Sequence, residues 1–286
     1  MHPLLHLQTE LPPLERPVLL VALEGFIDAG GVAGTAAMFL RHRWKSELVA
    51  TFDRDDLIDY RARRPTVVVD SGKLRRVEWP DIELMGATVG GPHDALLLLG
   101  PEPDMRWAAF CDAVVAVSRQ AGVEAAIGLG AYPAAAPHTR PVRIMRATNL
   151  VAGDLVPEAG DIVGYTGPVG AGTVLQAALG DAGIPAVGLW AEVPHYISGS
   201  PNPGGALALV RCVAAAMHTE VETTELEAAA KLHREQVDEA VAEHPEAGEM
   251  VQALERHVDS GGADGELPSG DDLAAEIERF LRTQSD

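Results

Sequence analysis

Four short runs of apolar residues constrain the fold of this chain more than any other feature. They are residues 18–23, 95–99, 125–130 and 186–190. A continuous apolar run of this length is typical of a strand that is covered on both faces. Helical patterns alternate with these runs, at residues 32–41, 107–120, 173–179 and 206–217. The alternation predicts a three-layer α/β fold, in which a largely parallel sheet has helices on both faces.

Weaker patterns predict further strands around this core. The candidates lie at residues 48–53, 66–69, 142–145 and 162–165. Two short stretches of alternating apolar and polar residues, at 75–77 and 82–89, indicate an antiparallel excursion from the sheet.

Charge and periodicity both change near residue 218. Of the net charge of −20, residues 220–286 carry −14, from 19 acidic and 5 basic side chains. Apolar residues at near-heptad spacing predict a helical hairpin here, and a later amphipathic pattern predicts one more helix. We therefore predict four parts in chain order. They are an α/β domain (1–217), an acidic helical hairpin (218–258), a glycine-rich linker (259–270) and an amphipathic terminal helix (271–286).

The composition argues against several classes of protein. A net charge of −20 disfavours a nucleic-acid backbone or an anionic membrane surface as the partner. No apolar run approaches the ~18 residues that a membrane helix needs, and the first residues lack the pattern of a signal peptide. Cys111 and Cys212 are far apart in helical patterns, which indicates buried thiols in a reducing compartment. We expect a cytoplasmic protein.

A candidate site follows the run at 125–130. Two prolines bracket His138, Thr139 and Arg140, and they stiffen the loop that presents these side chains. Ligands of open α/β sheets bind at the carboxyl ends of strands, which is where this loop is expected. Three predicted strand ends also carry an acid, namely Glu24, Glu102 and Glu192.

These polar side chains allow two interpretations. Converging carboxylates with a histidine and an arginine could perform acid–base chemistry or bind a polar ligand. Alternatively, the acids form structural ion pairs with arginines such as Arg61, Arg63 and Arg140.

Specific catalytic motifs are missing from the sequence. The glycine-rich stretch at 25–34 lacks the Gly-Lys-Ser/Thr ending of a Walker A loop, and 128–130 lacks the third glycine of a dinucleotide fingerprint. Residues 167–172 follow a predicted strand and open a helix, so their amides could hold an anion, although tight packing explains the glycines equally well. No metal-ligand spacing or nucleophile elbow is present. We predict no catalytic residue, no metal and no cofactor.

Several segments together carry a family resemblance. They are residues 25–30, Phe52-Asp53 with 59–65, 100–103 with Trp107, and 137–141. In this order they resemble the proteasome assembly chaperone 2 family, in its bacterial, actinobacterial-type branch. The resemblance implies a phosphorylase/hydrolase-like α/β fold and self-association into a homo-oligomer, such as a trimer.

Pattern and resemblance together define eleven candidate residues for ligand binding or for an interface. These are Glu24, Asp28, Tyr60, Arg61, Arg64, Glu102, His138, Thr139, Arg140, Glu192 and His195.

The leading hypothesis is a non-catalytic protein-binding or assembly factor. Its partners would be further copies of itself and another protein such as proteasome subunits, contacted by the terminal helix or the strand-end loops. The alternative is an enzyme or small-molecule receptor with a nucleoside-phosphorylase-like strand-end cleft. There His138 and Arg140 would bind a polar or anionic group, and a strand-end glutamate would act as base or acceptor. A third interpretation places the same loops at a subunit interface.

Overall fold

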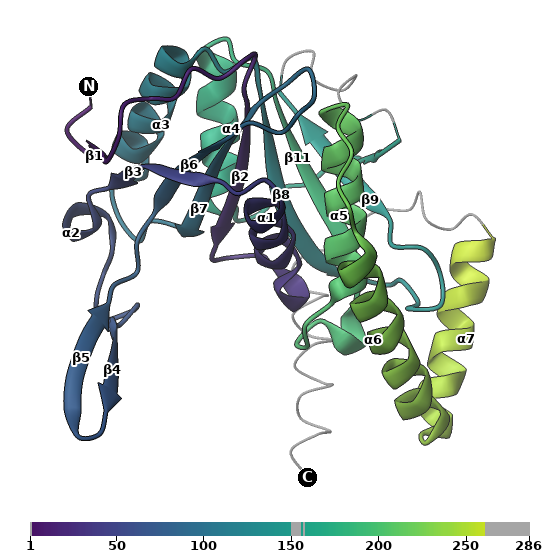
Figure 1. Cartoon of the computed structure of the whole chain (residues 1–286). Coiled ribbons are helices and arrows are strands. Elements are labelled where there is room, and N and C mark those ends of the chain that lie inside the picture. The colour runs from purple at the N-terminus through teal and green to yellow at the C-terminus, as the bar shows by residue number, and fades with distance from the viewer. Residues whose placement is uncertain (1, 150–155, 157, 261–286) are drawn as a thin grey trace.

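The computed structural model describes residues 2–149, 156 and 158–260. Its main sheet has nine strands in the order β1-β3-β6-β7-β2-β8-β11-β9-β10 (Figure 1). Their bounds are β1 Leu5–Leu7, β2 Val18–Glu24, β3 Glu47–Phe52, β6 Glu83–Ala87, β7 Ala95–Pro101, β8 Ala125–Ala134, β9 Ile144–Thr148, β10 Gly160–Asp161 and β11 Ala186–Pro194.

The four predicted apolar runs form the centre of this sheet. Strands β7, β2, β8 and β11 are adjacent and parallel, so that Val18 lies opposite both Ala95 and Ala125. The flanking strands β1, β3, β6 and β9 pair antiparallel with their inner neighbours. The continuous apolar runs follow from burial on both faces: successive side chains of β7 enter opposite clusters, Leu97 one and Leu96 and Leu98 the other.

Helices cover both faces of the sheet (Figure 1), which confirms the predicted three-layer α/β fold. Helices α1 (Val32–Arg43) and α5 (Pro203–Ala216) pack on one face, and α3 (Trp107–Ala121) and α4 (Ala171–Asp181) on the other. The cores are largely aliphatic, with Leu40 and Leu209 on the first face and Val114 and Leu175 on the second.

Two strand predictions need correction. The predicted strand at 162–165 is not formed: β10 ends at Asp161, and the next residues leave the sheet edge as an exposed loop. The stretches at 75–77 and 82–89 are antiparallel but have different partners. The first belongs to β5 (Lys73–Glu78), which pairs only with β4 (Thr66–Asp70), whereas β6 enters the main sheet because Leu84 and Met85 are both buried.

Helices α6 (Thr224–Ala242) and α7 (Pro245–Asp259) form the predicted acidic segment and contact each other. Leu226 near the start of α6 is buried in the core cluster of α1 and α5. The domain boundary near residue 217 therefore stays a prediction, and the predicted terminal helix lies outside the described residues. A short α2 (Arg54–Leu57) and two single-turn helices, η1 (Ala29–Gly31) and η3 (His195–Ile197), complete the described elements. None of the helices within the described ranges is long and apolar enough to cross a membrane.

Candidate functional site

The carboxyl ends of β2, β7, β8 and β11 meet at one edge of the sheet, which we call the strand-end edge. Glu24 ends β2, Glu102 directly follows β7 and Glu192 lies near the end of β11. They do not converge on one site, however. The Glu24 carboxylate is exposed, Glu102 contacts α4, and Glu192 accepts a hydrogen bond from the Tyr132 hydroxyl at 3.0 Å.

Glu102 occupies the helix N-terminus that the sequence indicated as a possible anion site. Its Oε2 accepts a hydrogen bond from the Ala171 amide, the first residue of α4, at 2.9 Å. The close approach requires a glycine nearby, since a Cβ on Gly25 would lie 2.2 Å from the Glu102 carboxyl carbon. A bound phosphate would therefore meet a carboxylate instead of a free helix terminus.

Asp28 occupies the N-terminus of α1 in the same way. Its two carboxylate oxygens accept hydrogen bonds from the amides of Ala33 at 2.7 Å and Gly34 at 3.0 Å. Burial raises the pKa of Asp28, and these backbone hydrogen bonds oppose that rise. Both glycine-rich helix N-termini of the strand-end edge thus hold a carboxylate of the chain itself.

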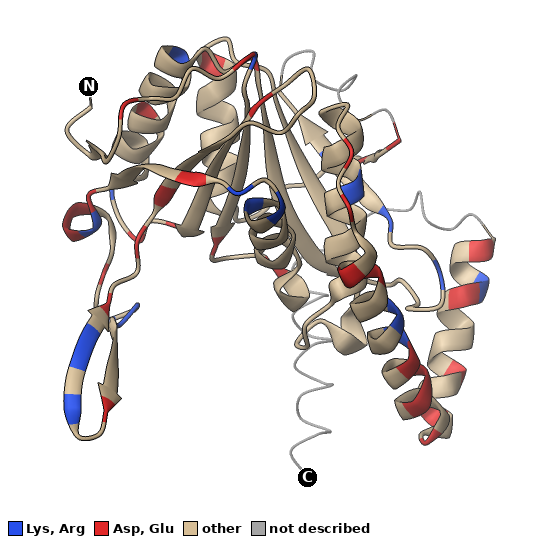
Figure 2. Ribbon diagram, in the orientation of Figure 1, with Lys and Arg blue, Asp and Glu red and all other residues tan. Residues whose placement is uncertain are grey.

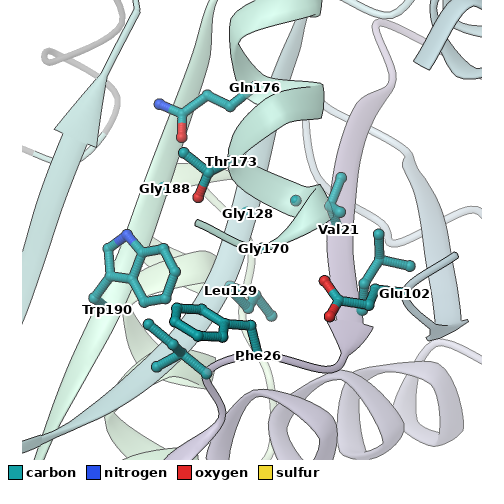
Figure 3. Close-up of a pocket in the computed structure, with 13 residues that line it drawn as sticks. Val21, Phe26, Glu102, Gly128, Leu129, Gly170, Thr173, Gln176, Gly188 and Trp190 are labelled. Atoms are coloured by element: carbon teal, nitrogen blue, oxygen red, sulfur yellow. The ribbon is translucent and has the colours of Figure 1, made fainter. Parts of the chain in front are cut away.

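A small pocket of about 50 Å³ lies beside the N-terminus of α4 (Figure 3). Phe26, Leu129 and Trp190 supply its apolar wall, and Glu102 lies on the opposite side. Ligand pockets for small molecules usually measure ~300–1,000 Å³, so this one is too small for a nucleoside.

Large apolar side chains are exposed at this pocket and in the loop that leads to α4. Phe26, which lies next to Gly170, and three residues of the loop before α4 are 39–82% exposed. We call Phe26, Val163, Tyr165 and Val169 the edge patch. The sequence patterns did not indicate these residues as a binding surface. For Phe26 and Val169 the available signal was a large apolar side chain inside a glycine-rich loop, whereas Val163 and Tyr165 lay in a predicted strand.

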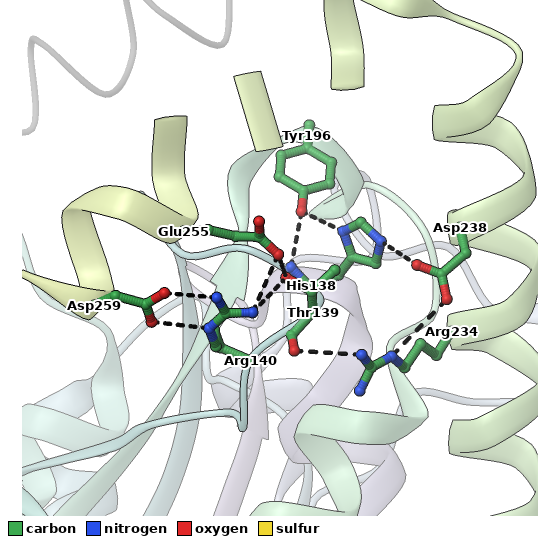
Figure 4. A network of polar contacts seen from close by, with 8 residues as sticks. All are labelled: His138, Thr139, Arg140, Tyr196, Arg234, Asp238, Glu255 and Asp259. Atoms are coloured by element: carbon green, nitrogen blue, oxygen red, sulfur yellow. Dashed lines mark hydrogen bonds and ion pairs between the residues drawn. The ribbon is translucent and has the colours of Figure 1, made fainter. Parts of the chain in front are cut away.

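The loop with His138, Thr139 and Arg140 binds the acidic helices (Figure 4). His138 Nε2 lies 3.0 Å from Asp238 of α6, and the Thr139 hydroxyl donates to Glu255 of α7 at 2.5 Å. The backbone carbonyl of Thr139 also accepts a hydrogen bond from Arg234 of α6 at 3.3 Å.

Arg140 makes the most extensive contact with α7. Its Nε and Nη2 donate to the two oxygens of Asp259 at 2.9 and 2.6 Å, and Nη1 donates to Glu255 at 3.1 Å. Such a bidentate pair fixes orientation as well as distance. Arg140 holds the pKa of Asp259 below its usual range. The predicted site loop is therefore where α7 attaches to the body, whereas α6 also packs on α5.

The His138 ring is locked in this network. Its side chain is 5% exposed, and Nδ1 lies 2.6 Å from the Tyr196 hydroxyl. That hydroxyl also accepts a hydrogen bond from the His138 amide at 2.8 Å, and burial raises the pKa of Tyr196 to about 12. His195 packs edge-on against Tyr196, so it supports the same ring cluster.

A larger cavity of about 550 Å³ lies between the loop of His138 and Arg140, the end of β11 and α6. It brings together three of the predicted residues, His138, Arg140 and Glu192. Three further cationic side chains line it, namely Arg211, Lys231 and Arg234.

The remaining predicted residues, Tyr60, Arg61 and Arg64, lie away from both the small pocket and the larger cavity. Tyr60 donates to Asp55, packs edge-on against Trp79 and has its pKa raised to about 12, mainly by burial. Arg61 and Arg64 are exposed just before β4. The predicted ion pairs of the strand-end acids with Arg61, Arg63 and Arg140 are not formed.

Arg63 pairs with Asp104 instead, at 3.1 Å. Of the strand-end acids, Glu192 does lie near an arginine, Arg143, at 3.7 Å. Within the described part of the chain, no group of three or more His, Cys, Asp or Glu side chains could hold a metal ion. Cys111 and Cys212 are free thiols, and burial raises the pKa of each to about 11.

The fold is shared with proteins that act on proteasomes. A Pyrococcus furiosus archaeal proteasome activator matches with a TM-score of 0.66 over 82% of this chain and 97% of its own, at 16% identity. This low identity shows a common α/β fold only.

Two actinobacterial structures are more similar in sequence. A Mycobacterium tuberculosis proteasome-assembly chaperone homologue is 36% identical, with a TM-score of 0.75 over 82% of this chain and 99% of its own. A second M. tuberculosis protein, of unknown function, is 33% identical, with a TM-score of 0.84 over 100% of this chain and 98% of its own.

No curated protein matches the chain. The model of the PAC2 family matches residues 22–241, and the chain belongs to this family. The resemblance that the sequence motifs indicated, including its actinobacterial branch, is confirmed.

Proposed function

We propose that this protein is a non-catalytic assembly factor that forms a homo-oligomer in the cytoplasm and binds other proteins through the edge patch. The main support is that aromatic side chains are exposed in the edge patch, while the nearby helix N-termini already hold Glu102 and Asp28 instead of a free anion site. Membership of the PAC2 family supports this role, as does a relative described as a proteasome-assembly chaperone homologue.

The chemistry of the edge patch suits a protein partner. Phe26 and Tyr165 are rigid, large side chains of the kind that dominate protein interfaces, where few residues supply most of the binding energy. The adjoining pocket beside Trp190 has room for one small apolar side chain of a partner. Proteasome core subunits are the partner class that we propose.

Binding of purified proteasome subunits from the same organism tests this proposal. The variant Phe26→Ser/Tyr165→Ser should bind them about 30-fold more weakly, since hot-spot residues contribute ~2 kcal/mol or more. The matched control is Met38→Ser/Met105→Ser, which removes two apolar side chains exposed to a similar degree elsewhere. Equal affinity of both variants in a titration calorimeter would rule out the edge patch as the binding surface.

The 550 Å³ cavity favours a second candidate function, that of a receptor for a small organic anion. Its size lies in the usual range for ligand pockets, and it is lined by Arg140, Arg211, Lys231 and Arg234 but only one acid, Glu192. Thermal shifts should then appear with one class in a panel of nucleotides, sugar phosphates and organic carboxylates. Arg211→Gln should reduce the shift. A panel without any shift would exclude this function.

A further inference from the structure

Glycines in the sheet create the space of the small pocket beside α4. Gly128 of β8 and Gly188 of β11 are register partners and line the pocket. They face α4, since a Cβ on Gly188 would lie 2.9 Å from Oε1 of Gln176 in that helix. A glycine inside a strand often marks a site where a ligand or another backbone approaches closely. The paired glycines therefore keep a space open between the sheet and the helix.

Two aromatic rings form one side of this pocket (Figure 3). Trp190 lies close against β8, because its register partner there is Gly130, where a Cβ would lie 2.3 Å from the ring. Phe26 is 51% exposed and lines the same pocket. An aromatic face attracts a cation that lies within about 6 Å of the ring centre. This side of the pocket thus suits an aliphatic stem or a cation.

The Glu102 carboxylate faces these rings from the other side of the pocket (Figure 3). Its Oε2 accepts the hydrogen bond from the Ala171 amide, whereas no described residue donates to Oε1. Glu102 also forms no ion pair with any residue that the structure describes. The carboxylate that keeps an anion away from α4 therefore leaves one oxygen open to a cation.

Two further acceptor oxygens line the pocket. Gln176 donates through Nε2 to the backbone carbonyl of Ala147 at 2.7 Å, so its Oε1 is the end that lies near Gly188. The hydroxyl of Thr173, three residues earlier in α4, lines the pocket as well (Figure 3). An ammonium group has three donors and no acceptor, and it matches a lining of this kind.

The surroundings of the pocket are acidic too. The Glu102 amide donates to the Glu24 carbonyl at 2.7 Å, and the Glu24 side chain is exposed without an ion pair among the described residues. Figure 2 shows acidic residues where β2 and β7 end, whereas basic residues gather elsewhere, for instance on β5 and α6. The field at this edge attracts cations and repels anions.

We propose that this pocket receives one lysine side chain of the protein partner. The aliphatic stem of the lysine lies against Phe26 and Trp190, and its ammonium group binds Oε1 of Glu102. A volume of about 50 Å³ suits a compact ammonium better than the wider, planar guanidinium of arginine. The inference rests on the proposed function, in which the edge patch binds a protein, and it names the side chain that is anchored there.

Amino-acid amides test the pocket without any partner protein. Nα-acetyl-lysine methylamide should shift the indole N–H signal of Trp190 in a heteronuclear NMR spectrum, and the shift should saturate. The corresponding norleucine amide has the same stem without the charge and should cause no saturable shift. The signal is assigned by its absence in Trp190→Phe. An equal response to both amides, no response to either, or tighter binding of the arginine amide would overturn the proposal.

Glu102→Gln tests the carboxylate. Glutamine still offers an oxygen to the Ala171 amide but carries no charge, so the lysine amide should bind about tenfold more weakly. The matched control is Glu24→Gln, which removes the same charge from an exposed position on the same edge and should change the affinity less than about twofold. Equal affinities of the two variants would show that the ammonium does not bind Glu102.

Gly128→Ala tests the space itself. A Cβ on Gly128 meets no atom closer than 3.7 Å, so the variant keeps the fold, but its methyl group occupies the floor of the pocket. Binding of the lysine amide should be lost while the melting temperature does not fall. Gly248→Ala in α7, where a Cβ meets nothing within 4 Å, should bind as the natural chain does. Undiminished binding to Gly128→Ala would place the lysine elsewhere.

Proteasome subunits separate this inference from the proposed function. Glu102→Gln should weaken their binding about tenfold and Glu24→Gln should not. If Phe26→Ser/Tyr165→Ser weakens binding but Glu102→Gln does not, the edge patch stands and the lysine site is wrong. If the subunits do not bind the natural chain, the proposed function fails, and the lysine amide titration still decides whether the pocket binds an ammonium group.

Discussion

Gly100→Ala is expected to lower the free energy of unfolding by about 3 kcal/mol or more. Gly100 has a φ of 125°, which a residue with a side chain adopts only under strain. A Cβ there would also lie 2.3 Å from the backbone oxygen of Asp81 and 3.0 Å from Cα of Ile82. Backbone atoms cannot move aside by a change of rotamer, so the strain and the overpacking add. Urea denaturation measures the loss.

Gly122→Ala is the matched control for this prediction. Gly122 ends α3 with a φ of 73°, and a Cβ there has no neighbour within 4 Å. Alanine at this position should lower the free energy of unfolding by about 1 kcal/mol, because it adds only the strain of the positive φ and no clash. The difference in unfolding free energy between the two variants therefore measures the clash near the end of β7. Equal midpoints would contradict the close approach of Gly100 to the backbone of Asp81 near the end of β7.

Arg140→Ala is expected to release α7 from the body. The side chain donates three hydrogen bonds to Asp259 and Glu255, and only the Thr139 hydroxyl is a further donor to Glu255 among the described contacts. Without it, both carboxylates lose their cation, and α7 keeps only one buried apolar side chain, Val251. Amide exchange across α7 should become about tenfold faster, because local opening free energies set exchange rates. Exchange in α3, on the far face of the sheet, should not change.

Arg211→Ala is the control for this second prediction. Arg211 also pairs with an acid of α6, Glu227, at 2.6 Å, but both side chains are largely exposed. An exposed ion pair contributes little, so the exchange rates of α6 and α7 should stay at their natural values. If α7 exchanges at the same rate in both variants, the loop of His138 is not the attachment point of α7.

The central sheet was predictable because its strands are buried on both faces. The run at 95–99, for example, contains no polar residue, which is typical of a central parallel strand. The failure at 162–165 has the opposite cause. It is rich in residues that favour strands, but Val163 and Tyr165 are exposed in a loop of the edge patch. A short apolar segment alone does not distinguish a core strand from an exposed binding surface.

The role of the loop at 137–141 was not predictable from local pattern. Its partners lie far along the chain: Asp238 is 100 residues from His138, and Asp259 is 119 residues from Arg140. Nothing in the loop itself shows which distant acids will reach it. The strand-end glutamates were predicted to converge for a related reason. Glu102 and Glu192 do lie at the same edge, but β2 and β8 separate their strands.

The most direct test of the proposed function is amide exchange of the protein alone and in complex with proteasome core subunits. We expect slower exchange in residues 25–31 and 163–170 on binding, with no change across residues 137–141. Protection that appears only at 137–141 and on α6, while the edge patch exchanges as in the free protein, would contradict it.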